Sequence, residues 1–460
     1  MDVIEQLVRN VVVTSYENIP SEAIEMEKAN VLDIIGCLVA GAAAPGCSAV
    51  MELAREMGGK EESTIMMYGG KVPAQTAALV NATMARAIDF EAHSAGPSHA
   101  SAPTVATAFA IGEKLGGVSG KDFLTALSVG IDLTTRLYHS CNIARYGWDP
   151  ALVCAIFGAT AVAGKLLGLE ESQMVHAFGI ALNQAAGTYQ GNYDGALTVR
   201  LNTGLAARDG IFSALLAQRG ITGVKQVMQG KWGFYHLYAR DEYDPEVLID
   251  ELGERFRDVE TPFKTYPSCY ATHMVTEATI ELARKHDIKP DDVAEIIVGV
   301  AIGASDSFVG RPFKMGENLQ VDAQFSIQYT AANALLRRDS LKEHFTDEFI
   351  TDPQVQELVN KVKQVEVRQS HAYGRALSPL RVEIRMKDGK SYSTQCVSPR
   401  GSLERPLSKE EIVEKFRDSI RYSAKTSKAL PVEKVEKILA LVDHLEGLDN
   451  VNQIVELVIA

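Results

Sequence analysis

Cysteine is scarce in this sequence and shows no pairing pattern. The 460 residues contain six cysteines, and none of them forms a Cys-x-x-Cys pair. Zinc fingers and small disulfide scaffolds both need regular cysteine spacing, so this scatter argues against both classes. We expect reduced thiols, as in a cytosolic protein.

Positive charge and long apolar runs are also limited. The formal net charge is −13, which argues against a nucleic-acid-binding surface and against docking on an anionic membrane. No apolar run reaches the ~20 residues that a membrane span needs. The sequence begins Met-Asp-Val-Ile-Glu, without the basic and apolar regions of a signal peptide. These absences predict a cytoplasmic protein with no nucleic-acid partner and no membrane partner.

Several standard catalytic and cofactor motifs are missing as well. The sequence has no Gly-x-Gly-x-x-Gly after a predicted strand, no Walker loop, no His-Glu-x-x-His and no Gly-x-Ser-x-Gly. Dinucleotide-binding, nucleotide-binding, zinc-protease and serine-hydrolase functions therefore lose support. An anionic small ligand is compatible with the acidic composition if Arg, Lys and His cluster locally.

The first 250 residues predict helices almost throughout. Apolar residues recur at helical spacing, and Pro, Ser and Gly mark the helix ends. The stretches concerned are 4–12, 21–41, 73–87, 103–115, 119–131 and 150–167. Many of them are rich in Ala and Gly and carry little charge on any face, which predicts a thick buried core.

The composition changes near Glu251, where charged residues become frequent. Residues 294–301 and 362–367 predict strands, and residues 381–397 predict a hairpin with a type I′ turn at Asp388-Gly389. Further helices are expected at 270–286, 323–336, 353–362, 408–419 and 432–445. The last two could pack back on the first domain.

A chain of 460 residues is longer than one hydrophobic core usually supports, so two domains are expected. We predict a mainly α protein, with a helical domain formed by residues 1–257 and 399–460. Residues 258–398 are predicted to form a smaller α+β domain.

The most informative stretch is the polar loop between two small-residue helices, within residues 82–103. Asp89, Glu91, His93 and His99 place two carboxylates and two imidazoles within eleven residues. These groups suit general acid–base catalysis, since imidazole titrates near neutrality. Two alternatives stay open from the residues alone: a surface turn with incidental histidines, and a metal site.

Two further stretches contain a cation that suits an anionic ligand. Lys264 precedes a predicted helix start near Ser268, where free backbone amides attract a carboxylate. Arg200 lies in an otherwise neutral segment and can hold a carboxylate through two hydrogen bonds. An ordinary helix cap and a structural salt bridge would leave the same patterns.

Taken in order, these stretches resemble the MmgE/PrpD family of 2-methylcitrate dehydratase and cis-aconitate decarboxylase. The resemblance spans nearly the whole chain and includes Ile88-Asp89-Phe90 with a following histidine, Arg200-Leu-Asn, Lys264 before Tyr-Pro-Ser-Cys, and Gly401-Ser402. It implies a large all-helical domain built from both chain ends, a smaller α+β lid domain, and a cleft between them. It also implies a homodimer, and neither a cofactor nor a metal.

The catalytic positions of the family carry over in part. Asp89, His99 and Lys264 stand where the family has its acid, its loop histidine and its junction lysine. At four positions the sequence departs from the family pattern: His93 for a common threonine, Asp149 for a second histidine, Val199 for a lysine, and Phe308 near the tyrosine of the decarboxylases. We therefore expect a substrate other than 2-methylcitrate and cis-aconitate.

The predicted site is assembled from these observations. The predicted catalytic residues are Asp89, His93, His99 and Lys264. The predicted substrate-binding residues are Arg200, Ser101, Asp149, Ser268, Cys269, Tyr270 and His273. Residues 267–273 are also similar to the iminodisuccinate epimerase branch of the family.

The reactions of this family share one chemical demand, a carbanion-like centre next to a carboxylate. An enzyme meets this demand with a base near the carbon and a fixed cation near the carboxylate. The leading hypothesis is a cofactor-free lyase, either a hydro-lyase or a decarboxylase, acting on a small di- or tricarboxylate. An epimerase of a substituted succinate and a non-catalytic ligand-binding paralogue are the alternatives.

Overall fold

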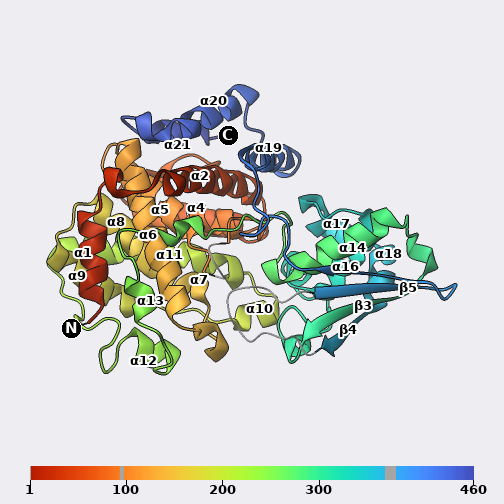
Figure 1. Ribbon diagram of the computed structural model, residues 1–460. Coiled ribbons are helices and arrows are strands. Elements are labelled where there is room, and N and C mark those ends of the chain that lie inside the picture. The colour runs from red at the N-terminus through yellow and green to blue at the C-terminus, as the bar shows by residue number, and fades with distance from the viewer. Residues whose placement is uncertain (1, 94–97, 368–379) are drawn as a thin grey trace.

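Helices dominate the structure, and the predicted mainly α class is confirmed. The structure is a computed structural model that describes residues 2–93, 98–367 and 380–460. Figure 1 shows a large helical body beside a small sheet that is covered by helices. Within the described residues, no helix combines the length and apolar character needed to cross a bilayer.

The helical body is built around long helices that are buried on most faces. Its elements before residue 250 are α1 (Ile4–Val13), α2 (Ser21–Gly41), α3 (Cys47–Met57), β1 (Ser63–Thr64), β2 (Lys71–Val72), α4 (Ala74–Arg86), α5 (Ser101–Lys114), α6 (Gly120–Ser140), α7 (Pro150–Val153), α8 (Ala155–Leu166), α9 (Glu171–Leu182), α10 (Gln190–Asp194), α11 (Thr198–Gln218), α12 (Phe234–Ala239) and α13 (Glu246–Ile249). The predicted helix at 150–167 is interrupted at Cys154, where α7 ends and α8 begins.

Small residues allow these helices to approach closely. Helices α6 and α8 cross where Gly130 faces Gly158, and a Cβ atom added at Gly158 would lie 2.6 Å from the Gly130 carbonyl oxygen. That separation is far inside van der Waals contact, so only glycine fits this crossing. The Ala- and Gly-rich composition seen in the sequence is therefore a packing requirement of the core.

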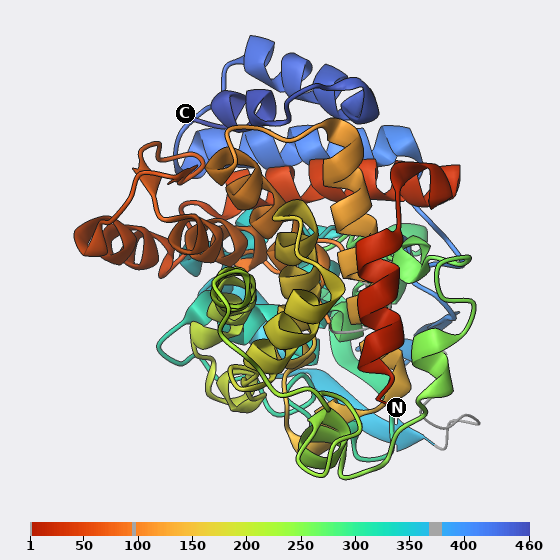
Figure 2. The ribbon, with the colours of Figure 1, turned by 90° about the vertical axis from the view of Figure 1, so that its left-hand side faces the viewer.

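The last part of the chain returns to the helical body. It comprises α19 (Lys409–Thr426), α20 (Val432–Asp443) and α21 (Asn452–Leu457). Helix α19 packs on α2, and Figures 1 and 2 both show the blue C-terminal helices against the red α2. One hydrophobic cluster contains residues from α1 through Phe263 together with residues from α19, α20 and α21.

A second hydrophobic cluster lies in the α+β part, between residues 274 and 396, and also includes Val199. Its elements are α14 (His273–Lys285), β3 (Val293–Ala301), α15 (Leu319–Gln324), α16 (Ile327–Arg337), α17 (Asp347–Ile350), α18 (Pro353–Val359), β4 (Val362–Val367), β5 (Leu380–Met386) and β6 (Ser391–Cys396). The boundaries 257/258 and 398/399, and the role of this part as a lid, stay predictions.

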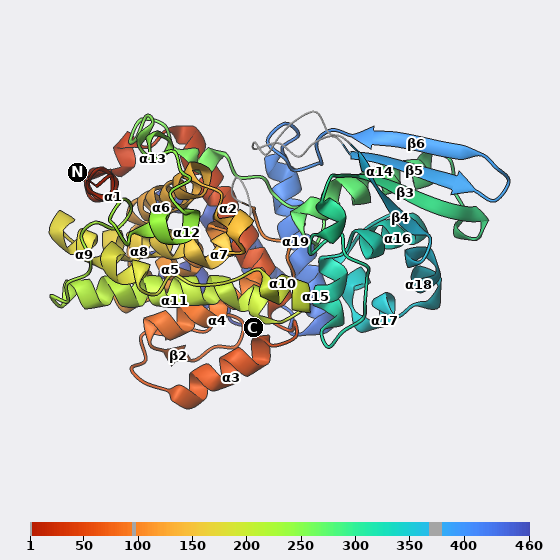
Figure 3. The ribbon, with the colours of Figure 1, turned by 90° about the horizontal axis from the view of Figure 1, so that it is seen from below.

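The four strands form a mixed sheet in the order β4-β3-β5-β6. Strand β3 pairs with β4 in parallel and with β5 antiparallel, and β5 pairs with β6 antiparallel. Side chains alternate across the sheet, so Ile296 and Ile384 are buried against the helices while Glu295 and Arg385 lie on the other face. Figure 3 shows this sheet at the opposite end of the molecule from α9, with α10, α15 and α19 between.

Two local predictions for the α+β part need correction. The hairpin β5–β6 is present, but only Gly389 has a positive φ (90°), and its N–H donates to the Met386 carbonyl. The turn is thus a longer loop than the predicted two-residue type I′ turn, which needs two positive φ angles. The predicted helix at 323–336 is two helices, because Ser326 caps α16 by accepting a hydrogen bond from the Tyr329 N–H.

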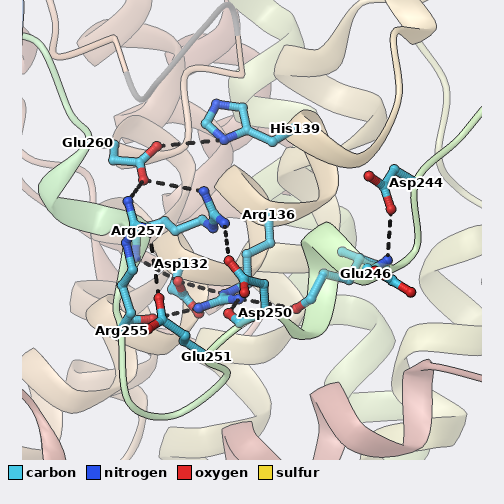
Figure 4. A network of polar contacts seen from close by, with 11 residues as sticks. Asp132, Arg136, His139, Asp244, Glu246, Asp250, Glu251, Arg255, Arg257 and Glu260 are labelled. Atoms are coloured by element: carbon cyan, nitrogen blue, oxygen red, sulfur yellow. Dashed lines mark hydrogen bonds and ion pairs between the residues drawn. The ribbon is translucent and has the colours of Figure 1, made fainter.

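A buried arginine fixes the segment that leads from the helical body to the α+β part. Arg136 of α6 pairs with Asp132, and its guanidinium donates to the Asp250 carbonyl at 2.6 Å. Asp132 in turn accepts a hydrogen bond from the Arg257 N–H at 2.7 Å. Figure 4 shows this network of polar contacts around residues 250–260. The network holds the chain directly before Lys264.

Next to this network, two carboxyl groups are buried against each other. Glu27 of α2 and Asp258 are both fully buried. Burial and the neighbouring Asp258 carboxylate raise the pKa of Glu27, and burial and Asp132 raise the pKa of Asp258. Two adjacent carboxyls in a low dielectric cannot both ionise cheaply, so the folded protein retains a proton here.

This carboxyl pair predicts a pH-dependent stability. As pH rises above ~4, the usual carboxyl pKa, the unfolded chain loses protons that the folded pair retains. The free energy of unfolding should therefore fall with rising pH, and it should recover as pH falls. We expect Asp258→Asn to reduce this slope, measured by urea denaturation between pH 5 and 8. Asp287→Asn, at an exposed carboxyl whose pKa is lowered by Lys289 and Arg338, is the control and should leave the slope in place. Equal slopes in the Asp258 variant and the wild-type protein would contradict the prediction.

Candidate active site

The predicted catalytic loop lies between the end of α4 at Arg86 and the start of α5 at Ser101. The structure describes it except for residues 94–97. Asp89 and His99 have positive φ angles of 51° and 47°. Such backbone conformations are uncommon for residues other than glycine, although Asp and His adopt them more readily than most, and they cluster at functional sites.

Two cations converge on Asp89 in the interior. The Lys264 Nζ atom lies 2.6 Å from Oδ1 of Asp89, and Arg86 forms an ion pair with the same oxygen. Burial alone would raise the pKa of Asp89, but Arg86 and Lys264 lower it to about 2. Asp89 is therefore ionised and a weak base at neutral pH. The predicted meeting of the loop with the junction lysine is present in the structure.

Glu91 rather than Asp89 contacts the loop histidine. Oε1 of Glu91 lies 2.7 Å from Nδ1 of His99 and 3.3 Å from Nε of Arg86. A carboxylate this close attracts a proton onto Nδ1 by charge, although the contact lacks hydrogen-bond alignment, and Nε2 is then the nitrogen that keeps its lone pair. Asp89, in contrast, is paired with Arg86 and Lys264.

The two histidines of the loop lie against each other and against Tyr270. The ring centroids of His93 and His99 are 5.0 Å apart in a T-shaped contact, and His93 stacks on Tyr270 at 4.9 Å. Burial lowers the pKa of both histidines well below the usual value, with the Lys264 charge acting in the same direction. Both imidazoles are therefore neutral at pH 7 and able to accept a proton.

A small cavity opens onto these groups at the meeting of the helical body and the α+β part. Its lining residues are Arg86, Asp89, His93, His99, Asp149, Tyr189, Asn192, Lys264, Cys269, Tyr270, Phe308 and Phe325. The cations, carboxylates and neutral imidazoles thus face one space, bounded on another side by aromatic rings. Such a mixture of apolar walls and convergent polar groups is typical of a small-molecule site.

Asp149 and Phe308, two of the positions that depart from the family pattern, face the cavity. Asp149 caps α7, since Oδ1 accepts from the Ala151 N–H at 2.9 Å and Oδ2 accepts from the Asn202 amide at 2.7 Å. Burial raises the pKa of this carboxyl. The Phe308 ring stacks on Tyr189, with centroids 5.3 Å apart.

Cys269 and Tyr270 line the cavity, whereas two other predicted junction residues lie behind it. Burial raises the pKa of Cys269 to about 11, so its side chain is a thiol at neutral pH. Ser268 forms a hydrogen bond with the Thr272 hydroxyl. The His273 ring is fully buried beside the Ser268 carbonyl, and burial lowers its pKa to about 3.

Arg200 and Ser101 lie outside the set of described residues that line the cavity. The Arg200 guanidinium donates to the Pro45 carbonyl at 3.0 Å and to the Gln320 side chain at 3.2 Å. The Ser101 hydroxyl donates to Asn30 at 3.2 Å. In this structure both side chains form hydrogen bonds within the protein, and their predicted roles in substrate binding stay predictions.

Sequence reasoning missed several residues of the site. Arg86 is the most consequential, because it contacts both Asp89 and Glu91. Its position three residues before Asp89, at the end of an otherwise uncharged helix, was a usable signal. Tyr189, Asn192 and Phe325 also line the cavity, but they come from distant segments and carried no local signal.

A metal ion would compete with cations that are already present. Asp89, Glu91 and His99 each offer a ligand atom, and these atoms lie within 4.8 Å of one another. However, Lys264 and Arg86 already pair with the two carboxylates. A divalent cation there would have to displace an ammonium or guanidinium group, so the donor set suits an anionic ligand better.

Comparisons with known proteins match both parts of the chain. The MmgE/PrpD N-terminal domain matches residues 5–246, and the MmgE/PrpD C-terminal domain matches residues 266–441. A cis-aconitate decarboxylase of Homo sapiens is 30% identical over 83% of this chain and 78% of its own length. One of Aspergillus terreus (strain NIH 2624 / FGSC A1156) is 27% identical over 96% of this chain and 92% of its own length.

A more distant relative carries a different activity in its name. The mitochondrial 2-methylcitrate dehydratase of Yarrowia lipolytica (strain CLIB 122 / E 150) is 26% identical over 70% of this chain and 62% of its own length. Decarboxylases and dehydratases are both lyases, because each breaks a bond without hydrolysis or oxidation. The chain belongs to the MmgE/PrpD family and is a lyase of that family.

Proposed function

We propose that this protein is a cofactor-free lyase that removes a proton next to a carboxylate of a small di- or tricarboxylic acid. One observation carries the proposal: a neutral imidazole, His99, backed by Glu91, shares a buried cavity with the Lys264 ammonium. The first group suits proton transfer and the second suits the charge that develops on the carboxylate. Side chains of this chain thus offer both a base and a cation for such a reaction.

In a hydro-lyase reaction, Nε2 of His99 takes the proton from the carbon beside the carboxylate. The electron pair of that C–H bond forms a C=C bond, and the hydroxyl on the adjacent carbon leaves as water after receiving a proton. Lys264, and Arg86 beside it, stabilise the negative charge that builds on the carboxylate. Tyr270 and His93 line the same cavity and are the candidate donors of the proton to the leaving hydroxyl.

In a decarboxylase reaction, the C–C bond to one carboxylate breaks and carbon dioxide leaves. Its electron pair stays on the remaining fragment, which then takes one proton from an acid of the site. The same cations hold the other carboxylates. The same cavity thus suits either reaction, and the relatives are named for both activities.

One observation bears on the epimerase alternative. An epimerase needs two proton-transfer groups on opposite faces of one carbon, and the rings of His93 and His99 touch each other instead. Such a contact leaves no space for a substrate carbon between them. This favours a lyase over an epimerase that uses these two histidines as its pair.

Incubation with a panel of di- and tricarboxylates in D₂O, including cis-aconitate and 2-methylcitrate, tests the proposal. We expect loss of water or of carbon dioxide from one member, with deuterium at the carbon that exchanges, followed by NMR. An epimerase would exchange deuterium without any other change of mass. A ligand-binding paralogue would do neither, and that result would overturn the proposal.

The cavity thiol is expected to be dispensable. Neither dehydration nor decarboxylation by this route needs a nucleophile, and burial keeps Cys269 protonated at neutral pH. We expect Cys269→Ser to keep most of the activity, within about threefold of wild-type kcat/KM. A loss comparable to that of Lys264→Ala, measured on the same substrate, would show that the thiol takes part.

A further inference from the structure

A buried ion pair lies directly behind the catalytic loop. Asp33 of α2 and Lys415 of α19 are in contact, with Nζ of Lys415 2.6 Å from Oδ1 of Asp33. Their side chains are 1% and 6% exposed. Both residues lie outside the described lining of the cavity, so neither can touch a substrate there.

Each partner of this ion pair also binds the main chain of the loop. Oδ2 of Asp33 accepts a hydrogen bond from the Ala92 N–H at 2.7 Å, and Nζ of Lys415 donates to the Phe90 carbonyl at 2.7 Å. The Lys415 ammonium also lies 4.2 Å from the centroid of the Phe90 ring. The two peptide groups that are held are those on either side of Glu91.

Glu91 is the residue through which this clamp reaches the reaction. Its carboxylate lies 2.7 Å from Nδ1 of His99 and 3.3 Å from Nε of Arg86. A shift of the Glu91 main chain would move its carboxylate away from His99. The His99 backbone has a positive φ, a conformation that lasts only while surrounding contacts hold it.

The location of the pair argues for a positioning role rather than a stabilising one. A buried ion pair is weak evidence for stability, since replacing both partners with apolar groups of similar volume is often neutral. Burial raises the pKa of Asp33, and the Lys415 charge opposes this rise. Both charges are buried, and each binds a peptide group of the same loop. This arrangement suits a role in holding the loop in position.

We propose that Asp33 and Lys415 are positioning residues, which fix the main chain on both sides of Glu91 so that Glu91 holds His99 in its reactive orientation and tautomer. The effect on turnover rests on the function proposed above, whereas the clamp on the loop does not. Loss of the clamp should lower kcat and leave KM nearly unchanged, because the cations of the cavity stay in place.

The test uses Lys415→Met and the double variant Asp33→Leu/Lys415→Met, which leaves no unpaired buried charge. We expect kcat to fall about 100-fold, the typical effect of a displacement of ~1 Å at a catalytic group, with KM within about threefold. Hydrogen exchange at the Ala92 amide, followed by mass spectrometry of a peptide from residues 85–93, should become faster. Lys415→Arg should restore part of both.

The matched control is Lys409→Met on the same helix, because Lys409 is exposed and pairs with Asp443 at the surface. It should leave kcat and the exchange of Ala92 unchanged. A folded Lys415→Met or double variant with wild-type kcat, or an equal loss in the Lys409 control, would overturn the proposal. If no substrate is turned over even by the wild-type protein, the function is wrong, and unchanged exchange at Ala92 would then reject the clamp independently.

Discussion

Replacement of His99 by asparagine is expected to lower kcat at least about 100-fold while the fold stays intact, since positioned acid–base groups typically contribute 100- to 10,000-fold. Asparagine tolerates the positive φ at this position and keeps a polar side chain near Glu91. It lacks only the basic nitrogen that accepts the proton. Steady-state kinetics on the substrate found in the D₂O panel, with circular dichroism to check folding, measure this effect.

The pH dependence of kcat/KM of the wild-type enzyme is a second test of the role of His99. Burial lowers the pKa of His99, so the neutral base persists below pH 6.5 and the acidic decline of kcat/KM should lie below that value. His236→Asn, at an exposed histidine paired with Asp241, is the control and should leave the pH profile of kcat/KM unchanged. Near wild-type turnover by the His99 variant would contradict this assignment and leave His93 or Asp89 as the group that takes the proton.

Replacement of Lys264 by alanine is the second large effect that we expect. Lys264 is 1% exposed and is directed at Asp89 within the cavity. Its loss removes a cation from the place where the carboxylate gains charge, and removal of one such group commonly costs about 100- to 1,000-fold in kcat. We also expect KM to rise, because the same ammonium attracts the ground-state substrate.

The ratio of the two effects identifies the role of Lys264. A rise in KM with unchanged kcat would mean that Lys264 binds the substrate and its transition state equally, which would contradict a role in charge stabilisation. Lys387→Ala, at an exposed lysine of the β5–β6 loop, controls for the loss of one positive charge. Thermal unfolding of both variants is needed, since loss of Lys264 leaves Asp89 with Arg86 as its remaining cation among the described residues.

The sequence predicted helices and strands correctly where residue type and apolar spacing agree. It failed where a single side chain ends or starts a helix within a continuous apolar pattern. The strands at 294–301 and 362–367 match β3 and β4 closely. The helix expected at 323–336 is interrupted because the Ser326 side chain caps a new helix, a single hydrogen bond that apolar spacing does not reveal. Likewise, the length of the β5–β6 turn depends on how the two strands pair. In the structure Gly389 is the one residue of this turn with a positive φ.

Within the site, the sequence indicated which charged residues take part better than it indicated which residues pair with each other. One cavity is lined by all four predicted catalytic residues, Asp89, His93, His99 and Lys264. A polar loop between buried helices is expected to face such a cavity, because the helices on either side exclude water. Arg200 was an equally reasonable cation from its sequence, yet its guanidinium is used by Pro45 and Gln320. Which acid holds which cation depends on distances between distant segments, and no spacing in one chain specifies them.

The packing of α19 on α2 has a consequence for synthesis of the chain. The loop at residues 86–101 leaves the ribosome well before Lys415, which contacts its main chain and follows Phe90 by 325 residues. Contacts between segments so far apart in sequence form slowly, and domains near this size commonly fold through intermediates. A nascent chain that still lacks α19 therefore has the α19-facing side of α2 uncovered, and the Phe90 carbonyl has not yet gained its hydrogen bond from Lys415. The arrangement of the loop proposed above therefore depends on a helix that is made long after the loop itself.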